Sequence, residues 1–169
     1  MKQIRFFSLV ICATMATLSS CKEDDPEPAY EVKARLLAGA KGASKSWKLT
    51  STTVAYDGGT ETLEFSPCFL DNVYKFSNNA TQDYELSEGL SKCETEAPAI
   101  VESGTWSFTA DGGILVVLTY DFTGSDAVLF AYFAHPATVT ELTENSMKLR
   151  IVLDFDGEVE TYNFNFEAI

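Results

Sequence analysis

The chain has 169 residues, with 12 basic and 25 acidic side chains, a formal net charge of −13 and 46% apolar residues. So large an apolar share argues against a disordered chain, and the acidic balance argues against nucleic acid, whose phosphates require clustered Lys and Arg. A single histidine, His135, excludes a histidine-rich metal site and leaves little material for a Ser–His or Cys–His catalytic pair.

The first 20 residues have the pattern of a secretory signal. Lys2 and Arg5 are followed by a 13-residue apolar stretch, residues 6–18, that would reach about 20 Å as a helix, short of the hydrocarbon core of a bilayer. The next residues, Leu18-Ser19-Ser20-Cys21, resemble the lipobox of bacterial lipoproteins. This resemblance implies removal of residues 1–20 and lipidation of Cys21, which would anchor the protein in a membrane. The alternative is an ordinary cleaved signal followed by an incidental cysteine.

Residues 21–29 form an acidic, proline-containing segment that has nothing apolar to bury, so we expect a flexible tether. Its start, Cys21-Lys22-Glu23-Asp24-Asp25, resembles the export signal that sends lipoproteins of Bacteroides-type bacteria to the outer face of the outer membrane. We therefore expect an outer-membrane lipoprotein displayed at the cell surface, with the periplasmic face as the alternative. The remaining residues, 30–169, are expected to form one domain.

Cys68 and Cys93 are the two thiols that remain after Cys12 leaves with the signal and Cys21 carries lipid. In an oxidising compartment they are predicted to form a structural disulfide. A metal site is disfavoured because two cysteines with no nearby histidine lack ligands. A redox-active pair is disfavoured because the spacing is not Cys-x-x-Cys.

Hydrophobic periodicity predicts one helix followed by strands. Val32, Leu36 and Ala40 recur at helical spacing in residues 30–40, and the period changes to two after Trp47. The expected strands cover residues 47–56, 72–77, 81–87, 104–109, 113–120, 127–142 (broken at Pro136), 147–155 and 162–166. Asp156-Gly157 is a hairpin signal between the last two.

Eight antiparallel strands in sequence predict an all-β up-and-down barrel, because closure removes the two exposed edges of an open meander. In this order the long segments 57–71, 88–103 and 121–126, and the turn 156–157, lie at one end of the barrel. Cys68 and Cys93 then fall at the same end, and the helix enters from the opposite end and plugs it.

Several short sequence segments are similar to the lipocalin-like domain of Bacteroides-type lipoproteins. They are Lys45-Ser46-Trp47-Lys48-Leu49, Cys68-Phe69-Leu70-Asp71-Asn72 leading into Tyr74-Lys75-Phe76, Lys92-Cys93, Gly104-Thr105-Trp106-Ser107-Phe108 and Leu142-Thr143-Glu144-Asn145. The resemblance spans about residues 36–166 and implies an eight-stranded lipocalin-like (calycin-like) barrel with a tryptophan near its base. It implies no catalytic residue.

No sequence motif indicates catalysis, a cofactor or a metal site. His135 precedes a proline in an expected strand and is interpreted as structural or exposed. The segment Asp154–Glu160 lacks the ligand spacing of a calcium loop and is interpreted as a turn. A hydrolase with paired carboxylates would need two facing carboxyl groups, and no pair is singled out by its spacing. We therefore expect a protein that is not an enzyme.

Two functional hypotheses follow. In the first, the barrel is a binding module that holds a small apolar or amphipathic molecule, or a glycan, at its long-loop end, with aromatic residues as the candidate contacts: Tyr56, Phe65, Phe69, Tyr120 and Phe122. In the second, an accessory lipoprotein docks on an outer-membrane protein complex and binds nothing small. The aromatics would otherwise simply pack the core, as we expect of Trp47, Trp106, Phe108, Phe164 and Phe166 at the helix end.

Overall fold

The computed structural model describes residues 26–93, 98–122 and 135–169. In these ranges the elements are α1 (Ala29–Ala38), β1 (Ser44–Tyr56), β2 (Gly59–Thr62), α2 (Pro67–Leu70), β3 (Val73–Ser77), β4 (Asp83–Ser87), β5 (Ile100–Phe108), β6 (Ile114–Phe122), β7 (Ala137–Leu142), β8 (Ser146–Phe155) and β9 (Glu158–Ala168). The signal sequence, Cys21 and the start of the tether lie outside the described residues.

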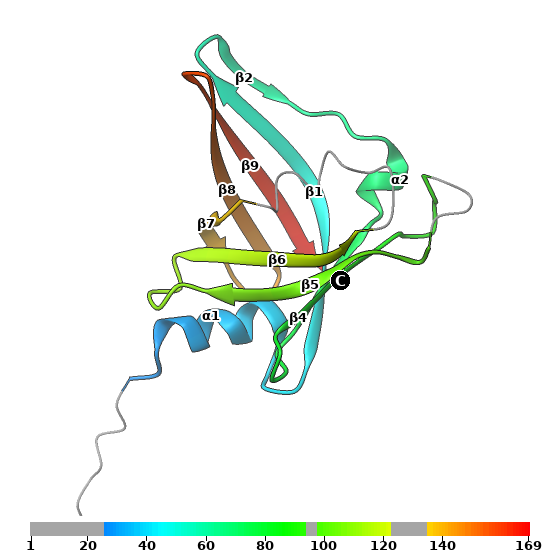
Figure 1. Cartoon of the computed structure of the whole chain (residues 1–169), viewed down its shortest axis with the longest axis vertical. Coiled ribbons are helices and arrows are strands. Elements are labelled where there is room, and N and C mark those ends of the chain that lie inside the picture. Colours follow the sequence, from blue (N-terminus) through cyan, green and yellow to red (C-terminus); the bar gives the residue numbers. More distant parts are fainter. Residues whose placement is uncertain (1–25, 94–97, 123–134) are drawn as a thin grey trace, which may run out of the picture.

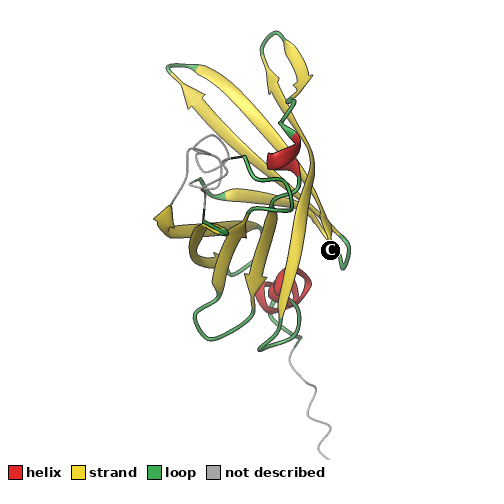
Figure 2. Ribbon diagram, turned by 90° about the vertical axis from the view of Figure 1, so that its right-hand side faces the viewer, coloured by secondary structure: helices red, strands yellow, loops and turns green. Residues whose placement is uncertain are grey.

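The strands form a closed antiparallel barrel, as predicted. Each strand from β3 to β9 pairs with its neighbour in sequence, β1 pairs with β3, and β1 also pairs with β9, which closes the sheet. Eight strands make the barrel, and β2 is an additional short strand paired with the end of β1. Beyond the closed part, β1 and β2 and the β8–β9 hairpin project as two arms (Figures 1 and 2). The two arms form what we call the rim.

The barrel departs from the prediction in segment 57–71, which was expected to be a loop. This segment contains both β2 and the single helical turn α2. All four residues of β2 are exposed, so their sequence carries no alternation of apolar and polar residues from which a strand could be predicted. The expected strand 127–142 begins in the described residues at Ala137, directly after Pro136, and residues 127–134 lie outside them.

Helix α1 lies across the end of the barrel opposite the rim (Figure 1), as predicted. The fully buried residues of the helix differ from those expected, although Leu36 does pack against the core. Ala34, Leu37 and Ala38 are buried, whereas Val32 and Leu36 are half-buried and Ala40, beyond the end of the helix, is exposed. Both sets have helical spacing, and contact with the barrel decides between them.

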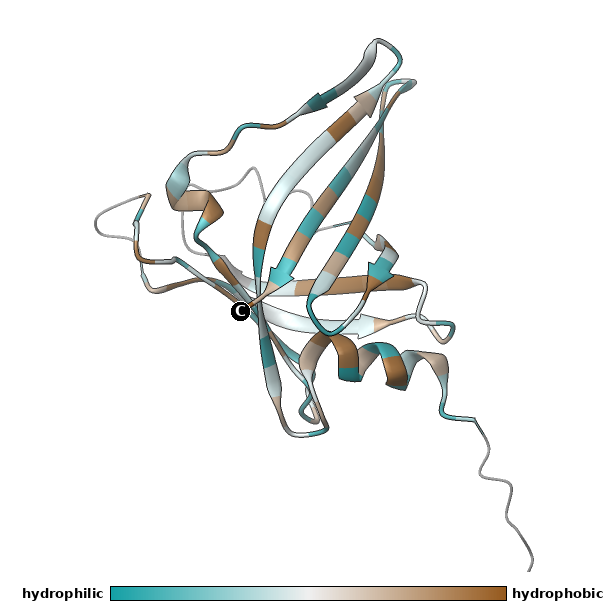
Figure 3. Cartoon of the chain, turned by 180° about the vertical axis from the view of Figure 1, so that it is seen from behind, coloured by the Kyte–Doolittle hydropathy of each residue, from teal (hydrophilic) through white to brown (hydrophobic). Residues whose placement is uncertain are grey.

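The core fills the barrel near α1. The strands β8 and β9 alternate between apolar and more polar residues (Figure 3), and the apolar Met147, Leu149, Phe164 and Phe166 are nearly inaccessible. Trp47 is fully buried, and its indole N–H donates a hydrogen bond of 2.8 Å to the Leu37 carbonyl of α1. Trp47 thus joins the barrel wall to the helix, in agreement with the tryptophan expected near the base. Trp106 is also buried, and Phe108 is half-buried against it.

The predicted disulfide is confirmed. Cys68, in α2, is bonded to Cys93, 25 residues later. Two hydrogen bonds also hold this region. The Ser91 amide donates to the Asp71 carboxylate at 2.8 Å, and the Cys93 amide donates to the Glu88 carboxylate at 3.2 Å. The segments before β3 and after β4 are therefore fixed to each other on the long-loop side of the barrel.

Candidate functional site

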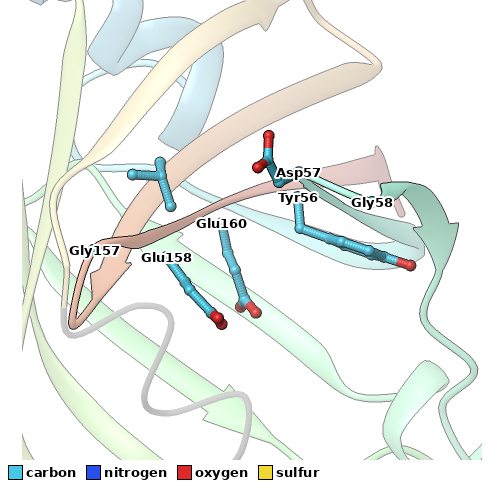
Figure 4. A pocket seen from close by; sticks show the side chains of 7 residues that line it. Tyr56, Asp57, Gly58, Gly157, Glu158 and Glu160 are labelled. Carbon is cyan, nitrogen blue, oxygen red and sulfur yellow. The ribbon is translucent and has the colours of Figure 1, made fainter.

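A cleft of about 490 Å³ lies at the rim, between the β1–β2 turn and the β8–β9 turn (Figure 4). Its lining consists of Tyr56, Asp57, Gly58, Gly157, Glu158, Val159 and Glu160. They come from the first and the last of the segments predicted to share one end of the barrel, 57–71 and 156–157, and from the ends of β1 and β9 beside them. Its volume lies in the range of small-molecule sites.

Strand pairing brings the two sides of the cleft together. The last paired residues of β1 and β9 are Ala55 and Thr161. Tyr56 and Glu160 are the next residues on these adjacent strands, so they lie close together. On the β8–β9 side, Asp156 and Gly157 both have positive φ, 55° and 95°, as a two-residue hairpin turn requires. The Gly157 amide donates to the Asp154 carboxylate at 2.7 Å, which fixes this turn.

The lining combines an aromatic ring with carboxylates. The Tyr56 side chain is 43% exposed. Glu158 and Glu160 project to one side of β9, and Asp57 projects to the other (Figure 4). The Glu160 carboxylate accepts a hydrogen bond from the Tyr162 hydroxyl. An aromatic face packs against apolar parts of a ligand and carboxylates accept hydrogen bonds from its hydroxyl groups, so the cleft has the chemistry for an amphipathic molecule or a glycan.

Of the five aromatic residues proposed as ligand contacts, the structure places Tyr56 in the cleft. Phe65 precedes α2 and Phe69 belongs to it; their ring centroids are 6.4 Å apart, and both pack against the core. Tyr120 is 69% exposed on β6, where its hydroxyl is 2.8 Å from the Thr105 hydroxyl. Phe122 ends β6, and its side chain lies outside the described part. The carboxylates of the cleft were not predicted, because 25 acidic residues give no signal that selects these.

A second feature that the sequence did not reveal is a buried carboxyl in the barrel wall. Glu102 is 2% exposed on β5, and it accepts a hydrogen bond from the Thr119 hydroxyl of β6. Burial raises the pKa of Glu102, while hydrogen bonds from Thr119 and Tyr84 oppose that rise. Gly104 pairs with both Tyr84 and Thr119. A Cβ there would meet the Leu118 carbonyl oxygen at 2.1 Å, so the strands require glycine at this close approach.

We expect Glu102→Gln to stabilise the protein at neutral pH. The folded state holds the Glu102 proton more tightly than the unfolded chain, so the free energy of unfolding falls as pH rises from the ordinary Glu pKa through the raised one. Thermal unfolding should show a higher midpoint for the variant at pH 7 and a smaller difference at pH 4. Glu61→Gln, in the exposed strand β2, is the control. An equal difference at both pH values would contradict the assignment.

The described residues include no cluster of three or more His, Cys, Asp or Glu side chains that could hold a metal ion. His135 is exposed, in agreement with its interpretation from the sequence. None of the helices in the described ranges has the length and hydropathy needed to cross a membrane.

Comparison with known families gives a match to the barrel. A family model described as a lipocalin-like domain matches residues 44–149, which run from the start of β1 into β8. No curated protein matches the chain.

Proposed function

Since this chain belongs to the lipocalin-like domain family, whose barrels generally bind small molecules rather than catalyse reactions, we propose that it is a lipid-anchored binding protein of the cell envelope. Its ligand is a small amphipathic molecule or a glycan, held at the rim. The cleft between the β1–β2 and β8–β9 turns supports this proposal, because it combines an accessible aromatic ring with carboxylates. Cys21 carries the lipid, and the protein is displayed on the outer membrane at the cell surface, or alternatively on its periplasmic face.

Native mass spectrometry of the protein purified from its own cells tests for a retained ligand. Short oligosaccharides and a fluorescent fatty acid serve as probes when no ligand is retained. A bound mass or a saturable response to either probe is expected. Failure of the native protein to retain a molecule, together with failure to respond to both probe classes, would overturn ligand binding.

We expect Tyr56→Ala to weaken binding of the responding probe about tenfold, since removal of a central aromatic contact costs more than 1 kcal/mol. The loss follows from the position of the exposed Tyr56 ring in the cleft. Calorimetric titration measures it. Tyr120→Ala is the matched control, because Tyr120 is also an exposed tyrosine and lies outside the cleft lining. An equal loss in both variants would place the site elsewhere.

Anchoring is tested separately. Labelled palmitate should enter the full chain in cells and should fail to enter the Cys21→Ser variant. Protease treatment of intact cells should degrade the protein if it is displayed at the surface. Resistance in intact cells, with degradation after the outer membrane is opened, would place it on the periplasmic face.

One observation favours the second function, an accessory lipoprotein that docks on an outer-membrane protein. The outward face of β6 carries Ile114, Leu118 and Tyr120, which are 37%, 57% and 69% exposed. An exposed apolar stripe on one strand is typical of protein–protein contacts. Cross-linking in intact cells tests this function. Recovery of one partner in wild type and its loss in Leu118→Glu would support it, and recovery of the lipoprotein alone would contradict it.

A further inference from the structure

A second cleft, of about 300 Å³, is lined by residues of α1. Helix α1 lies at the end of the barrel opposite the rim (Figure 1). We call this second cleft the base cleft. Helix α1 contributes Tyr30, Glu31 and Arg35 to its lining, Lys41 follows the helix, and Gln82 belongs to the turn between β3 and β4. It shares no residue with the rim cleft.

The length of the tether limits how far this cleft can lie from the proposed lipid. Pro26 is the first described residue, and four residues lie between it and Cys21, so five Cα-to-Cα steps join the two. A fully extended chain spans at most about 3.6 Å per residue, so the Cα atoms of Cys21 and Pro26 are within about 18 Å of each other. Glu27, the next residue, lines the base cleft. If Cys21 is lipidated as proposed above, the base cleft lies near the bilayer surface and the rim points away from it.

The charges in the base cleft are only partly paired. Arg35 forms an ion pair with Glu27, with 2.5 Å between Nη1 and Oε1. The Glu31 carboxylate accepts a hydrogen bond of 2.9 Å from the Tyr30 hydroxyl, a neutral donor. Lys41 is exposed and has no hydrogen bond or ion pair with any described residue. Among the described residues, the Lys41 ammonium group and the Glu31 carboxylate of this cleft therefore have no ionic partner.

The wall formed by the β3–β4 turn is polar and held in place. Gln82 has φ 53°, a left-handed conformation that is uncommon for residues other than glycine. Its carbonyl accepts a hydrogen bond of 2.8 Å from the Trp106 amide, and the side-chain amide of Asn78 donates to the Gly39 carbonyl at 2.8 Å. These bonds fix the backbone of Gln82 and the side-chain amide of Asn78, and both residues line the cleft without adding a net charge.

We propose that the base cleft binds the phosphoethanolamine headgroup of a phospholipid next to the anchor. Lys41, with the outer N–H groups of Arg35, binds the phosphate. Glu31 accepts hydrogen bonds from the ammonium group, and the exposed Tyr30 ring lies beside it. A purely anionic headgroup carries no cation that Glu31 could bind. A trimethylated ammonium group is cationic but has no N–H to donate to Glu31. The location rests on the proposed anchoring, whereas the ligand chemistry rests on the lining.

Titration of the full chain carrying Cys21→Ser tests the headgroup independently of lipidation. Dihexanoyl phosphatidylethanolamine is added below its micelle concentration, and backbone amide NMR signals are followed. Saturable shifts at Tyr30, Lys41 and Gln82 are expected, with a Kd on the order of 1 mM, as suits a shallow site for a small polar group. The corresponding phosphatidylglycerol and phosphatidylcholine, and inorganic phosphate, should each bind at least several-fold more weakly. Free glycerophosphoethanolamine should bind as tightly as the lipid, since the acyl chains lie outside the cleft.

Charge variants decide whether these residues carry the binding. Lys41→Glu and Glu31→Gln should each weaken binding about tenfold, because each removes one of two charge-assisted contacts. Lys48→Glu is the matched control, since Lys48 lies on β1 outside the base cleft and should leave the titration unchanged. Equal binding of inorganic phosphate, or equal titrations of wild type and Lys41→Glu, would overturn the proposal. Neither result bears on ligand binding at the rim, which is tested separately with the Tyr56→Ala variant.

Discussion

Trp47→Ala is expected to lower the free energy of unfolding by about 3–5 kcal/mol, as is typical for truncation of a large buried aromatic residue. Trp47 has no exposed surface, and its indole binds the Leu37 carbonyl of α1. The substitution therefore leaves a cavity and an unpaired carbonyl at the junction of barrel and helix. Urea unfolding followed by far-UV circular dichroism measures the loss, because this signal comes mainly from the peptide backbone.

Two further variants separate the causes. Trp47→Phe keeps most of the apolar contact and removes the indole N–H, so it should cost less than the alanine variant. Ser44→Ala lies at the exposed start of the same strand and should change the free energy of unfolding by less than about 0.5 kcal/mol. A loss below about 1 kcal/mol for Trp47→Ala would show that the helix does not depend on this contact.

Loss of the Cys68–Cys93 disulfide is expected to cost about 3.5 kcal/mol, from the chain entropy of a loop of about 25 residues. Cys68→Ala with Cys93→Ala removes both thiols together and so avoids a free reactive cysteine. The urea midpoint of this double variant should fall and should no longer respond to dithiothreitol. The reduced wild type is the control and should unfold near the midpoint of the double variant. If the double variant and the reduced wild type both unfold at the urea midpoint of the oxidised wild type, the disulfide adds no stability.

The disulfide effect should be local to the long-loop side. The Asp71–Ser91 and Glu88–Cys93 hydrogen bonds hold the same segments, so their amides should exchange with solvent faster once the bond is absent. The hydrogen bond between Trp47 and α1 lies at the other end of the barrel and should keep its protection. Hydrogen exchange of the double variant distinguishes this local loosening from global destabilisation.

The two ends of the barrel have different chemistry. The rim cleft combines Tyr56 with carboxylates, and the base cleft combines paired and unpaired charges around α1. The proposed anchor would place the base cleft near the lipid headgroups and the rim cleft on the far side. Ligand binding and membrane contact would then use separate surfaces, and the Tyr56 and Lys41 variants should affect them independently.

The sequence by itself determined the strand pattern and the closure of the barrel. Met147, Leu149 and Ile151 alternate with polar residues, and this period of two needs only local information. Counting the strands placed Cys68 and Cys93 at one end, and the disulfide between them is confirmed. In contrast, β2 was missed because all its residues are exposed, and pairing with β1 alone makes it a strand.

Only the tertiary structure decided which residues meet. Val32 and Leu36 have the same helical spacing as the residues that α1 does bury, and contact with the barrel selects the buried side. Glu102 has no mark in the sequence of a buried acid, because its burial and its hydrogen bond from Thr119 arise from the pairing of β5 with β6. Tyr56 and Glu160 are about a hundred residues apart and become neighbours through the β1–β9 pairing. Periodicity records which side of a strand faces the core, whereas a site depends on register between distant strands, which no local pattern encodes.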